Sequence, residues 1–378
     1  MEFKMGKHKI VFDKDRVEEA KQIRLALREG LPMGRVPFEF LPEMPPYKYT
    51  MGERVKDMEK ELEYQVDFMN FRFREFPDSD YIPYFTTVHL GQGMIPSMFG
   101  AKQVIVEHNQ PFIEGRVMES LENDLAKLPK RINPDTDGWG PILRKTVETF
   151  LDAADGEIPV CVCDHQSPYG IATKLIGNEN LMMAMYDTPE LVHDLMDIVT
   201  NAISDTIRAM ERWAGNPDLI VKNDCDPMPG GGLILWDDYI SVISPKLHEE
   251  FCLPYNSRLY REFGRGHLHT CGPNFPRYID AVLKNDPVSI DAIFLRGTAR
   301  TREDLLEMKR ITREKGIILR GSLITYENHF LDSNEAILPD ADLFDAMADG
   351  GGFYWYEWGK KETGVQLSDT IKRWNRRI

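Results

Sequence analysis

Short runs of β-branched and other apolar residues alternate with longer amphipathic stretches through most of this chain, and this alternation restricts its fold more than any other feature. The stretch 188–215 shows the helical type, because Val192, Met196, Val199 and Ile203 recur at every third or fourth position. We expect strands at 158–163, 219–222, 267–269, 290–295, 317–320 and 353–356. Alternating strands and helices predict parallel strands joined by crossover helices, either closed as a barrel or open as a doubly wound sheet.

Two features favour the closed form. No G-x-G-x-x-G motif follows the first predicted strand, and polar residues cluster just after strand ends, where barrel enzymes carry their active sites. Before residue 80, helices are predicted at 13–29 and 53–76, with Pro-rich connections around them. We therefore expect a single (β/α)8 TIM barrel, with 1–80 as an N-terminal helical extension packed on the barrel and 81–378 as the barrel catalytic domain.

Charge and composition exclude several classes of protein. The 378 residues include 46 basic and 61 acidic side chains, a net charge of −15, and the acidic residues are spread along the chain. Such a field disfavours nucleic acid and anionic membranes as partners. No apolar run reaches the roughly 18 residues of a membrane-spanning helix, and residues 1–9 are too basic and interrupted for a signal peptide. We expect a soluble cytoplasmic protein, and its five cysteines do not indicate a disulfide scaffold.

The segment 266–273, Gly-His-Leu-His-Thr-Cys-Gly-Pro, is the strongest local signal for chemistry, and it lies at the end of a short predicted strand. Residues two apart on a strand point to the same side, so His269 and Cys271 can converge on one metal ion. Imidazole and thiolate are typical zinc ligands. Two ligands do not make a site, however, and a core histidine, a buried thiol and a Gly-Pro turn would give the same pattern.

Polar residues at the ends of other predicted strands are candidates for the rim of the barrel. Asp164, Asp224 and Asp238 are the candidate catalytic acids. His165 and Gln166 are candidates for hydrogen bonding to a substrate. Ordinary turns with capped backbone groups would place such residues at the same positions.

Two arginines and one aromatic segment complete the candidate residues. Arg296 and Arg320 come after two late strands and are candidates for binding a substrate carboxylate, with surface salt bridges as the alternative. Tyr356, in the aromatic segment 353–358, is a candidate for lining a pocket that takes an aromatic or methylated ligand. Alternating core packing explains that segment equally well.

Several motifs, taken in order, resemble those of the uroporphyrinogen decarboxylase superfamily. An Ile-Ser-Pro helix start at 243–245, followed by Phe251, Pro254 and Tyr255, precedes the His-Thr-Cys-Gly strand end. Further pieces are Arg-Val-Pro at 35–37, the segment 91–100, Asp-Thr-Pro-Glu at 187–190 and Gly-Gly-Gly-Phe at 350–353. The resemblance spans about residues 15–374. It implies a single α/β barrel, and the branch that this chain resembles most is the zinc-dependent methyltransferases that work with corrinoid proteins.

In those methyltransferases, the His-x-Cys pair and a later cysteine bind zinc, which activates a methyl donor or acceptor. His269 and Cys271 match the first two positions, but the segment 352–359, where the later cysteine would lie, contains none. Glu357 is the nearest replacement, since a carboxylate can complete a tetrahedral zinc site. Glu357 can equally cap a turn or pair with a neighbouring lysine. A ligand set with one carboxylate suits activation of an ether, amine or alcohol better than that of a thiol.

The resemblance implies transfer of a methyl group between a small methylated substrate, of the O-methyl aromatic or methylamine type, and a corrinoid (cobalamin) carried by a partner protein. Zinc would serve as the Lewis acid. The first alternative is decarboxylation of a uroporphyrinogen-like tetrapyrrole, although the Arg-Gln-Ala-Gly-Arg-Tyr run of true decarboxylases is missing. The second is a non-catalytic barrel that binds a tetrapyrrole or corrinoid. A homodimer is expected only by analogy with the superfamily.

Overall fold

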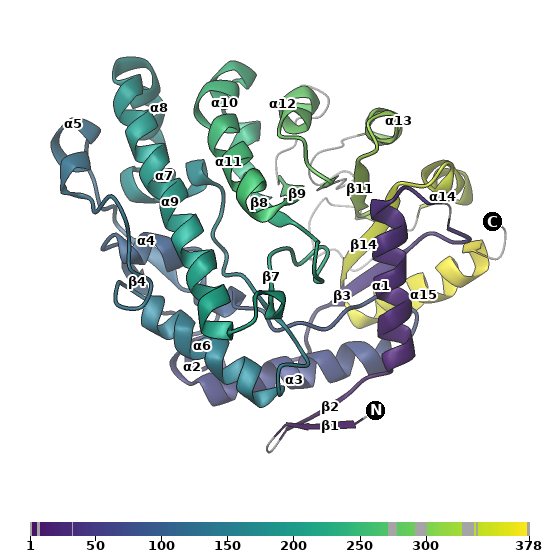
Figure 1. Ribbon diagram of the computed structural model, residues 1–378. Coiled ribbons are helices and arrows are strands. Elements are labelled where there is room, and N and C mark those ends of the chain that lie inside the picture. Colours follow the sequence, from purple (N-terminus) through teal and green to yellow (C-terminus); the bar gives the residue numbers. More distant parts are fainter. Residues whose placement is uncertain are drawn as a thin grey trace.

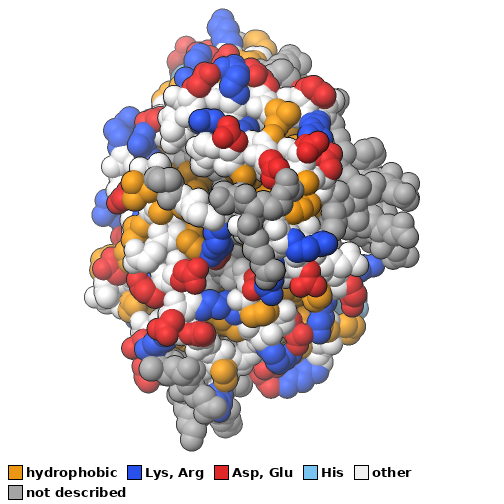
Figure 2. Space-filling view, turned by 90° about the vertical axis from the view of Figure 1, so that its right-hand side faces the viewer, with side chains coloured by type: hydrophobic (Ala, Val, Ile, Leu, Met, Phe, Trp, Pro, Cys, Tyr) orange, Lys and Arg blue, Asp and Glu red, His pale blue; other side chains and the backbone are white. Residues whose placement is uncertain are grey.

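The computed structural model describes residues 2–5, 8–31, 33–270, 278–291, 301–326, 336–337 and 339–375. Short strands lie at its centre, and helices surround them (Figure 1). Within these residues, no helix combines the length and apolarity needed to cross a membrane. On the face drawn in Figure 2, acidic and basic side chains are interspersed and do not form one patch of a single sign.

The central strands are parallel and belong to two sheets. The larger sheet has the order β3 (Phe38–Pro42), β14 (Phe353–Gly359), β11 (Ile318–Gly321), β10 (Ser289–Asp291), β9 (Arg265–His269) and β8 (Leu233–Trp236). The smaller sheet pairs β6 (Val160–Cys161) with β7 (Ile220–Val221). The mixed α/β class with parallel strands is therefore as predicted.

Backbone contacts outside these ladders connect the sheets. They are the hydrogen bond from Ile234 N–H to the Lys222 carbonyl (2.9 Å), the parallel bridge between Phe85 and Val160, and the hydrogen bond from Asp80 N–H to the Phe38 carbonyl (2.7 Å). Each extended segment thus has a neighbour on either side, and the segments succeed one another in a ring, which is the order of a parallel barrel.

The helices pack around this ring. They are α1 (Lys14–Arg28), α2 (Met51–Lys56), α3 (Met58–Glu75), α4 (Met94–Met98), α5 (Leu121–Asp124), α6 (Gly140–Ala153), α7 (Pro168–Ile176), α8 (Asn178–Asp187), α9 (Pro189–Ala214), α10 (Pro245–Phe251), α11 (Leu253–Phe263), α12 (Ile279–Lys284), α13 (Arg302–Glu314), α14 (Ala341–Ala348) and α15 (Lys361–Asn375). Three antiparallel pairs lie outside the ring: β1 (Glu2–Met5) with β2 (His8–Val11), β4 (Lys102–Val104) with β5 (Phe112–Glu114), and β12 (Thr325–Tyr326) with β13 (Ala336–Ile337).

Two helices show how local sequence sets these boundaries. Helix α9 begins at Pro189, whose fixed φ suits the first helical position, and Gly215 ends it in the left-handed region at φ 68°. The helix expected from residue 244 onward is divided at Cys252 into α10 and α11. Pro254 causes this break, because it has no N–H to donate and its ring clashes with the carbonyl of the preceding turn.

The structure also differs from the sequence analysis in the N-terminal segment and in the strand that precedes residue 237. The segment 1–80, predicted as a helical extension, also contributes β3 to the central sheet, where β3 pairs with β14. Strand β8 is not among the predicted strands, because it directly follows Gly230, Gly231 and Gly232, which are typical of a loop. The N-terminal part is therefore built into the ring of strands and does not only pack on it.

Register and pleat give the large sheet two different faces, since residues paired in register on neighbouring strands point the same way. The face called here the inner face carries Glu39, His267, His269, Ser289, Asp291, Arg320, Tyr354 and Tyr356. The outer face carries Trp355, which packs on Phe38 and against Phe344 of α14 and Trp374 of α15. Because helices cover the outer face, the inner face with its polar side chains points to the centre of the ring.

Candidate functional site

Two histidines and one aspartate meet at the carboxyl ends of β9 and β10. Asp291 Oδ2 lies 2.7 Å from Nδ1 of His269, and Asp291 Oδ1 lies 3.1 Å from Nε2 of His267. The other nitrogen of His267 lies 2.8 Å from Ser289 Oγ. The backbone N–H of Thr270 donates a further hydrogen bond to Asp291 (3.0 Å). Asp291 is thus the common acceptor of this cluster.

The charge on Asp291 decides which nitrogen of His269 carries the hydrogen. Burial alone would raise the pKa of Asp291, but the imidazoles of His269 and His267 outweigh burial and hold the pKa well below its ordinary value. A charged carboxylate only accepts hydrogen bonds, so Nδ1 of His269 carries the hydrogen that it donates to Asp291, and in the neutral tautomer the lone pair lies on Nε2. A carboxylate behind the ring orients many metal-binding imidazoles in this way.

The cluster has the residue types and spacing of a metal site. One ligand atom from each of His267, His269 and Asp291 lies within 4.8 Å of the other two. Nε2 of His269 lies 3.7 Å from Oδ1 of Asp238, and a quarter of the His269 side chain is exposed. Both nitrogens of His267 already contact oxygen atoms. His269, which is partly exposed and lies close to Asp238, is therefore the histidine of the cluster that could hold a metal ion, with Asp291 and His267 orienting its ring.

Of the other predicted metal ligands, Cys271 lies outside the described residues, and Glu357 lies on β14, which β11 and β10 separate from the strand of His269. Glu357 pairs in register with Phe40, so the strand pleat directs its side chain to the outer face. There it accepts hydrogen bonds from Ser322 Oγ, from one indole N–H and from two backbone N–H groups. Burial raises the pKa of Glu357 to about 7 in spite of these donors. Glu357 therefore does not face a metal ion held at His269.

The loop after β6 holds three of the predicted residues. Asp164 Oδ1 accepts a hydrogen bond from Nε2 of Gln166 (2.6 Å), and burial raises the pKa of Asp164. Gln166 has a backbone φ of 57°, which a residue with a side chain seldom adopts. His165 is fully buried against Trp236, and burial lowers its pKa to about 4, so its ring is neutral. A contact of His165 or Gln166 with a substrate stays a prediction.

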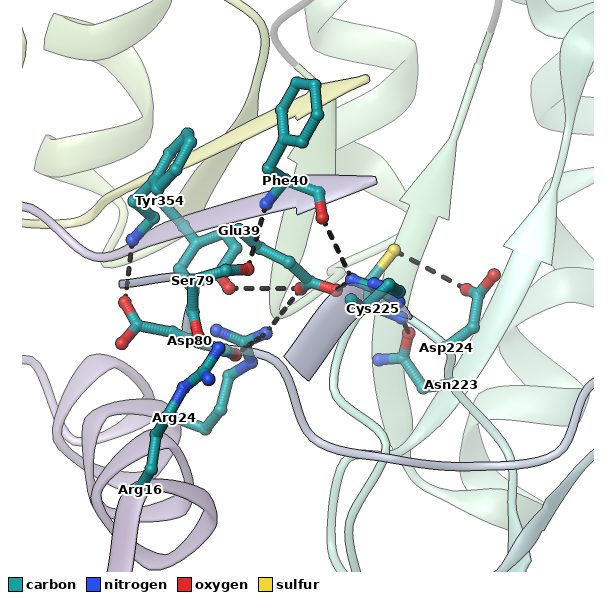
Figure 3. Close-up of polar contacts among 12 residues, drawn as sticks. Arg16, Arg24, Glu39, Phe40, Ser79, Asp80, Asn223, Asp224, Cys225 and Tyr354 are labelled. Atoms are coloured by element: carbon teal, nitrogen blue, oxygen red, sulfur yellow. Dashed lines mark hydrogen bonds and ion pairs between the residues drawn. The ribbon is translucent and has the colours of Figure 1, made fainter. Parts of the chain in front are cut away.

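The loop after β7 carries Asp224, another of the predicted catalytic acids. The Asp224 carboxylate accepts a hydrogen bond from the Cys225 thiol at 3.6 Å, and Asn223 Oδ1 accepts one from the Cys225 N–H at 3.1 Å (Figure 3). Burial raises the pKa of Cys225 well above its ordinary value, so the thiol is neutral. A catalytic role for Asp224 stays a prediction.

Arg320 and Tyr356 lie together on the inner face, and Arg296 lies outside the described residues. The guanidinium carbon of Arg320 is 3.6 Å from the centroid of the Tyr356 ring. Arg320 is also the register partner of Asp291 on the neighbouring strand. The structure thus brings Arg320 next to the histidine cluster.

Three residues of the site were missed by the sequence interpretation. His267 and Asp291 were both assigned to predicted strands, and the spacing of two residues that linked His269 to Cys271 also links His269 back to His267. Lys174 of α7 is attracted by Asp164 and Asp238, although burial lowers its pKa. It also lines a cavity of about 590 Å³ beside the β4–β5 pair. No strand-end pattern points to a lysine within a helix.

Comparison with known proteins identifies the family. Residues 72–323, more than half of the 378 residues, match the family model described as Uroporphyrinogen decarboxylase (URO-D). The uroporphyrinogen decarboxylases of Xanthomonas axonopodis pv. citri (strain 306) and Xanthomonas euvesicatoria pv. vesicatoria (strain 85-10) are each 27% identical over 178 residues, which are 46% of this chain and 44% of those proteins. The chain thus matches less than half the length of these curated relatives.

A solved structure shares the fold. A methyltransferase from Methanosarcina mazei superimposes with a TM-score of 0.61 over 93% of this chain and 99% of that one, at 14% sequence identity. The matched proteins are enzymes, named as decarboxylases and as a methyltransferase. On the strength of the family match, the chain belongs to the uroporphyrinogen decarboxylase family.

Proposed function

We propose that this protein transfers a methyl group between a small methylated substrate and a corrinoid protein, with a zinc ion bound at His269. The observation that carries the proposal is the imidazole of His269, which Asp291 holds from behind while its other nitrogen points toward Asp238. These groups lie at the carboxyl ends of the parallel strands, where α/β barrels have their active sites. The name of the Methanosarcina neighbour agrees with this choice.

The residues of the site have separate tasks in this proposal. Bound zinc would act as a Lewis acid on the heteroatom that carries the methyl group and so lower the barrier to its departure. His269 and Asp238 supply a nitrogen and an oxygen ligand, and Cys271 is the further ligand expected from the His-x-Cys motif. Asp164 accepts from Gln166 through Oδ1, so its Oδ2 can carry the proton that the leaving heteroatom takes up. Its raised pKa favours that role.

The methyl acceptor is a corrinoid on a partner protein. Direct transfer needs the cobalt within bonding reach of the methyl group, so the corrinoid domain must dock at the carboxyl ends of β9 and β10. His269 is the last residue of β9 and its side chain is one-quarter exposed, which supports access to it from this end.

The test is the metal content of the purified protein and of two histidine variants. We expect about one zinc per chain in the wild type, loss of zinc in His269→Ala, and retention in His108→Ala, because His108 is exposed and lies outside the cluster. An absence of zinc from the wild type after zinc addition, or equal zinc in His269→Ala, would contradict the proposal.

The second candidate is decarboxylation of a tetrapyrrole, which the names of the curated relatives favour. A substrate with several carboxylates needs several open cations around it. Arg24 and Arg72 reach Glu39 on the inner face of the sheet, but both pair with Glu39 and so are not open to a substrate carboxylate. Turnover of uroporphyrinogen by the protein freed of metal would favour this candidate over methyl transfer.

A further inference from the structure

Arg320 is a buried cation that forms no ion pair with the described residues, although the carboxylate of Glu39 attracts it from a distance. Its residue is 8% exposed, and its guanidinium stacks on the ring of Tyr356. Within the described part of the chain, Arg320 makes no hydrogen bond or ion pair, and its Nε is buried without a partner. The surface salt bridge considered from the sequence is therefore excluded for Arg320.

The carboxylates around Arg320 are engaged elsewhere. Asp291, its register partner, accepts from His267, His269 and a backbone N–H. Glu39 accepts from Arg24, Arg72 and the hydroxyl of Tyr354, as Figure 3 shows for part of this network. Among the described residues, this arrangement leaves Arg320 without a carboxylate of its own.

An unpaired guanidinium in this position is costly for the folded chain. Burial of a charge without a counter-charge is strongly unfavourable, and arginine cannot escape the cost by losing its proton. Stacking on Tyr356 returns part of this energy, because the face of an aromatic ring attracts a cation. The stack also restrains the guanidinium, whose planar fork of donors suits a planar anion such as a carboxylate.

We propose that Arg320 binds the carboxylate of the substrate, so that the methyl donor is a small anion, of the O-methyl aromatic acid type and not a methylamine. That the ligand is a methyl donor rests on the proposed function. That it is an anion rests on the geometry of Arg320. A carboxylate paired with Arg320 would lie on the same face as His269, with Asp291 between their strands. A methylammonium ion there would meet the positive charge of Arg320 and be repelled.

A binding experiment tests this without any methyl transfer. The probes are 4-methoxybenzoate and its neutral counterpart 4-methoxybenzamide, titrated by calorimetry into wild type, Arg320→Gln and Arg310→Gln. Arg310 is the matched control, because it is an exposed arginine of α13 that pairs with Glu307 and Glu314. We expect the wild type and Arg310→Gln to bind the acid at least about tenfold more tightly than the amide, and Arg320→Gln to lose that preference.

Two further arms separate the possible causes. The titrations are repeated in His269→Ala, because zinc itself attracts carboxylates; persistence of the acid preference there assigns it to Arg320. Thermal unfolding of Arg320→Gln shows whether the variant folds, and we expect it to be at least as stable as the wild type. The inference would be overturned if the wild type bound acid and amide equally, or if His269→Ala lost the preference for the acid. Destabilisation of Arg320→Gln would also overturn it. If the wild type prefers the acid but transfers no methyl group, the proposed function is contradicted and the role of Arg320 in binding the anion still stands.

Discussion

The inner face of the barrel contains two groups of buried charges that differ in their pairing. Near β3, Glu39 accepts hydrogen bonds from Arg24 at 2.8 Å and from Arg72 at 2.9 Å, so both arginines have a carboxylate partner. Near β11, Arg320 is buried to a similar degree but has no ion pair in the described part of the structure. Both groups are buried on the inner face, and they differ in whether the arginines have a carboxylate partner.

The partners of a buried charge indicate whether it serves the fold or the site. Arg24 belongs to α1 and Arg72 to α3, so the pairs with Glu39 join two N-terminal helices to the central sheet. Arg320 forms no such link between the elements that the structure describes, and it lies beside the strand that carries Asp291. The paired group therefore stabilises the fold, whereas the unpaired charge and the histidine cluster form the site.

Removal of the shared partner in the paired group should have the largest effect. Glu39→Gln leaves two buried guanidinium groups without a counter-charge, and we expect the free energy of unfolding to fall by about 3–5 kcal/mol. Denaturant unfolding measures the change. Glu43→Gln, at an exposed position just beyond the end of β3, should change stability by less than about 0.5 kcal/mol. Equal effects of the two substitutions would remove the distinction between the groups.

Glu357 is a third case, a buried carboxylate whose hydrogen-bond donors are all neutral. Its pKa is raised from 4.5 to about 7 by burial, so between these values the native state holds a proton that the unfolded state has released. The free energy of unfolding should therefore fall as pH rises through this window. Residue 357 does not titrate in Glu357→Gln. Relative to this variant, the free energy of unfolding of the wild type should fall by about 3 kcal/mol across the window.

Urea unfolding of wild type and Glu357→Gln at the two ends of that pH window measures this difference. The variant provides its own control, because all other titrating groups are shared. A constant difference between the two proteins across the window would show that Glu357 is charged in the native state throughout.

Removal of the carboxylate behind His269 should have a smaller effect, which is measured on metal binding. Asp291→Asn keeps the shape of the side chain but loses the charge that holds the proton on Nδ1 of His269. We expect zinc affinity to fall by about 10–100-fold, measured by competition with a chelator. Asp280→Asn, at an exposed position on α12, is the control. Unchanged affinity in Asp291→Asn would show that Asp291 does not orient a metal ligand.

The smallest expected effect has the opposite sign. Arg320→Met keeps much of the side-chain volume and removes the unpaired charge, so the ligand-free protein should become more stable by about 1 kcal/mol. Thermal unfolding at low ligand concentration is the measurement. A clear loss of stability would place Arg320 in the same structural class as Arg24 and Arg72.

The sequence predicted the fold from periodicity, and it did best where a helix had strong end signals. Pro189 and Gly215 gave the limits of α9 to within a residue. The face of β14 could not be predicted, because the strand Phe-Tyr-Trp-Tyr-Glu-Trp-Gly is buried on both sides and shows no polar alternation. The assignment of Glu357 to the metal failed for this reason.

The site was only partly accessible to sequence reasoning. The strand end at His269 was identified, but its partner Asp291 could not be, because the register between β9 and β10 depends on packing of the whole sheet. Arg320 was a candidate for a carboxylate, yet the sequence could not tell a buried arginine from a surface one. Pairing, which decides the function of each charge here, is a property of the folded structure.

The most direct test of the central claim is methyl transfer from 4-methoxybenzoate to reduced cobalamin, monitored by the absorbance of the cobalamin. We expect zinc-loaded wild type to consume reduced cobalamin in proportion to the donor, and His269→Ala to consume none beyond the rate without protein. Equal rates for the wild type and His269→Ala would contradict a metal-assisted transfer at His269.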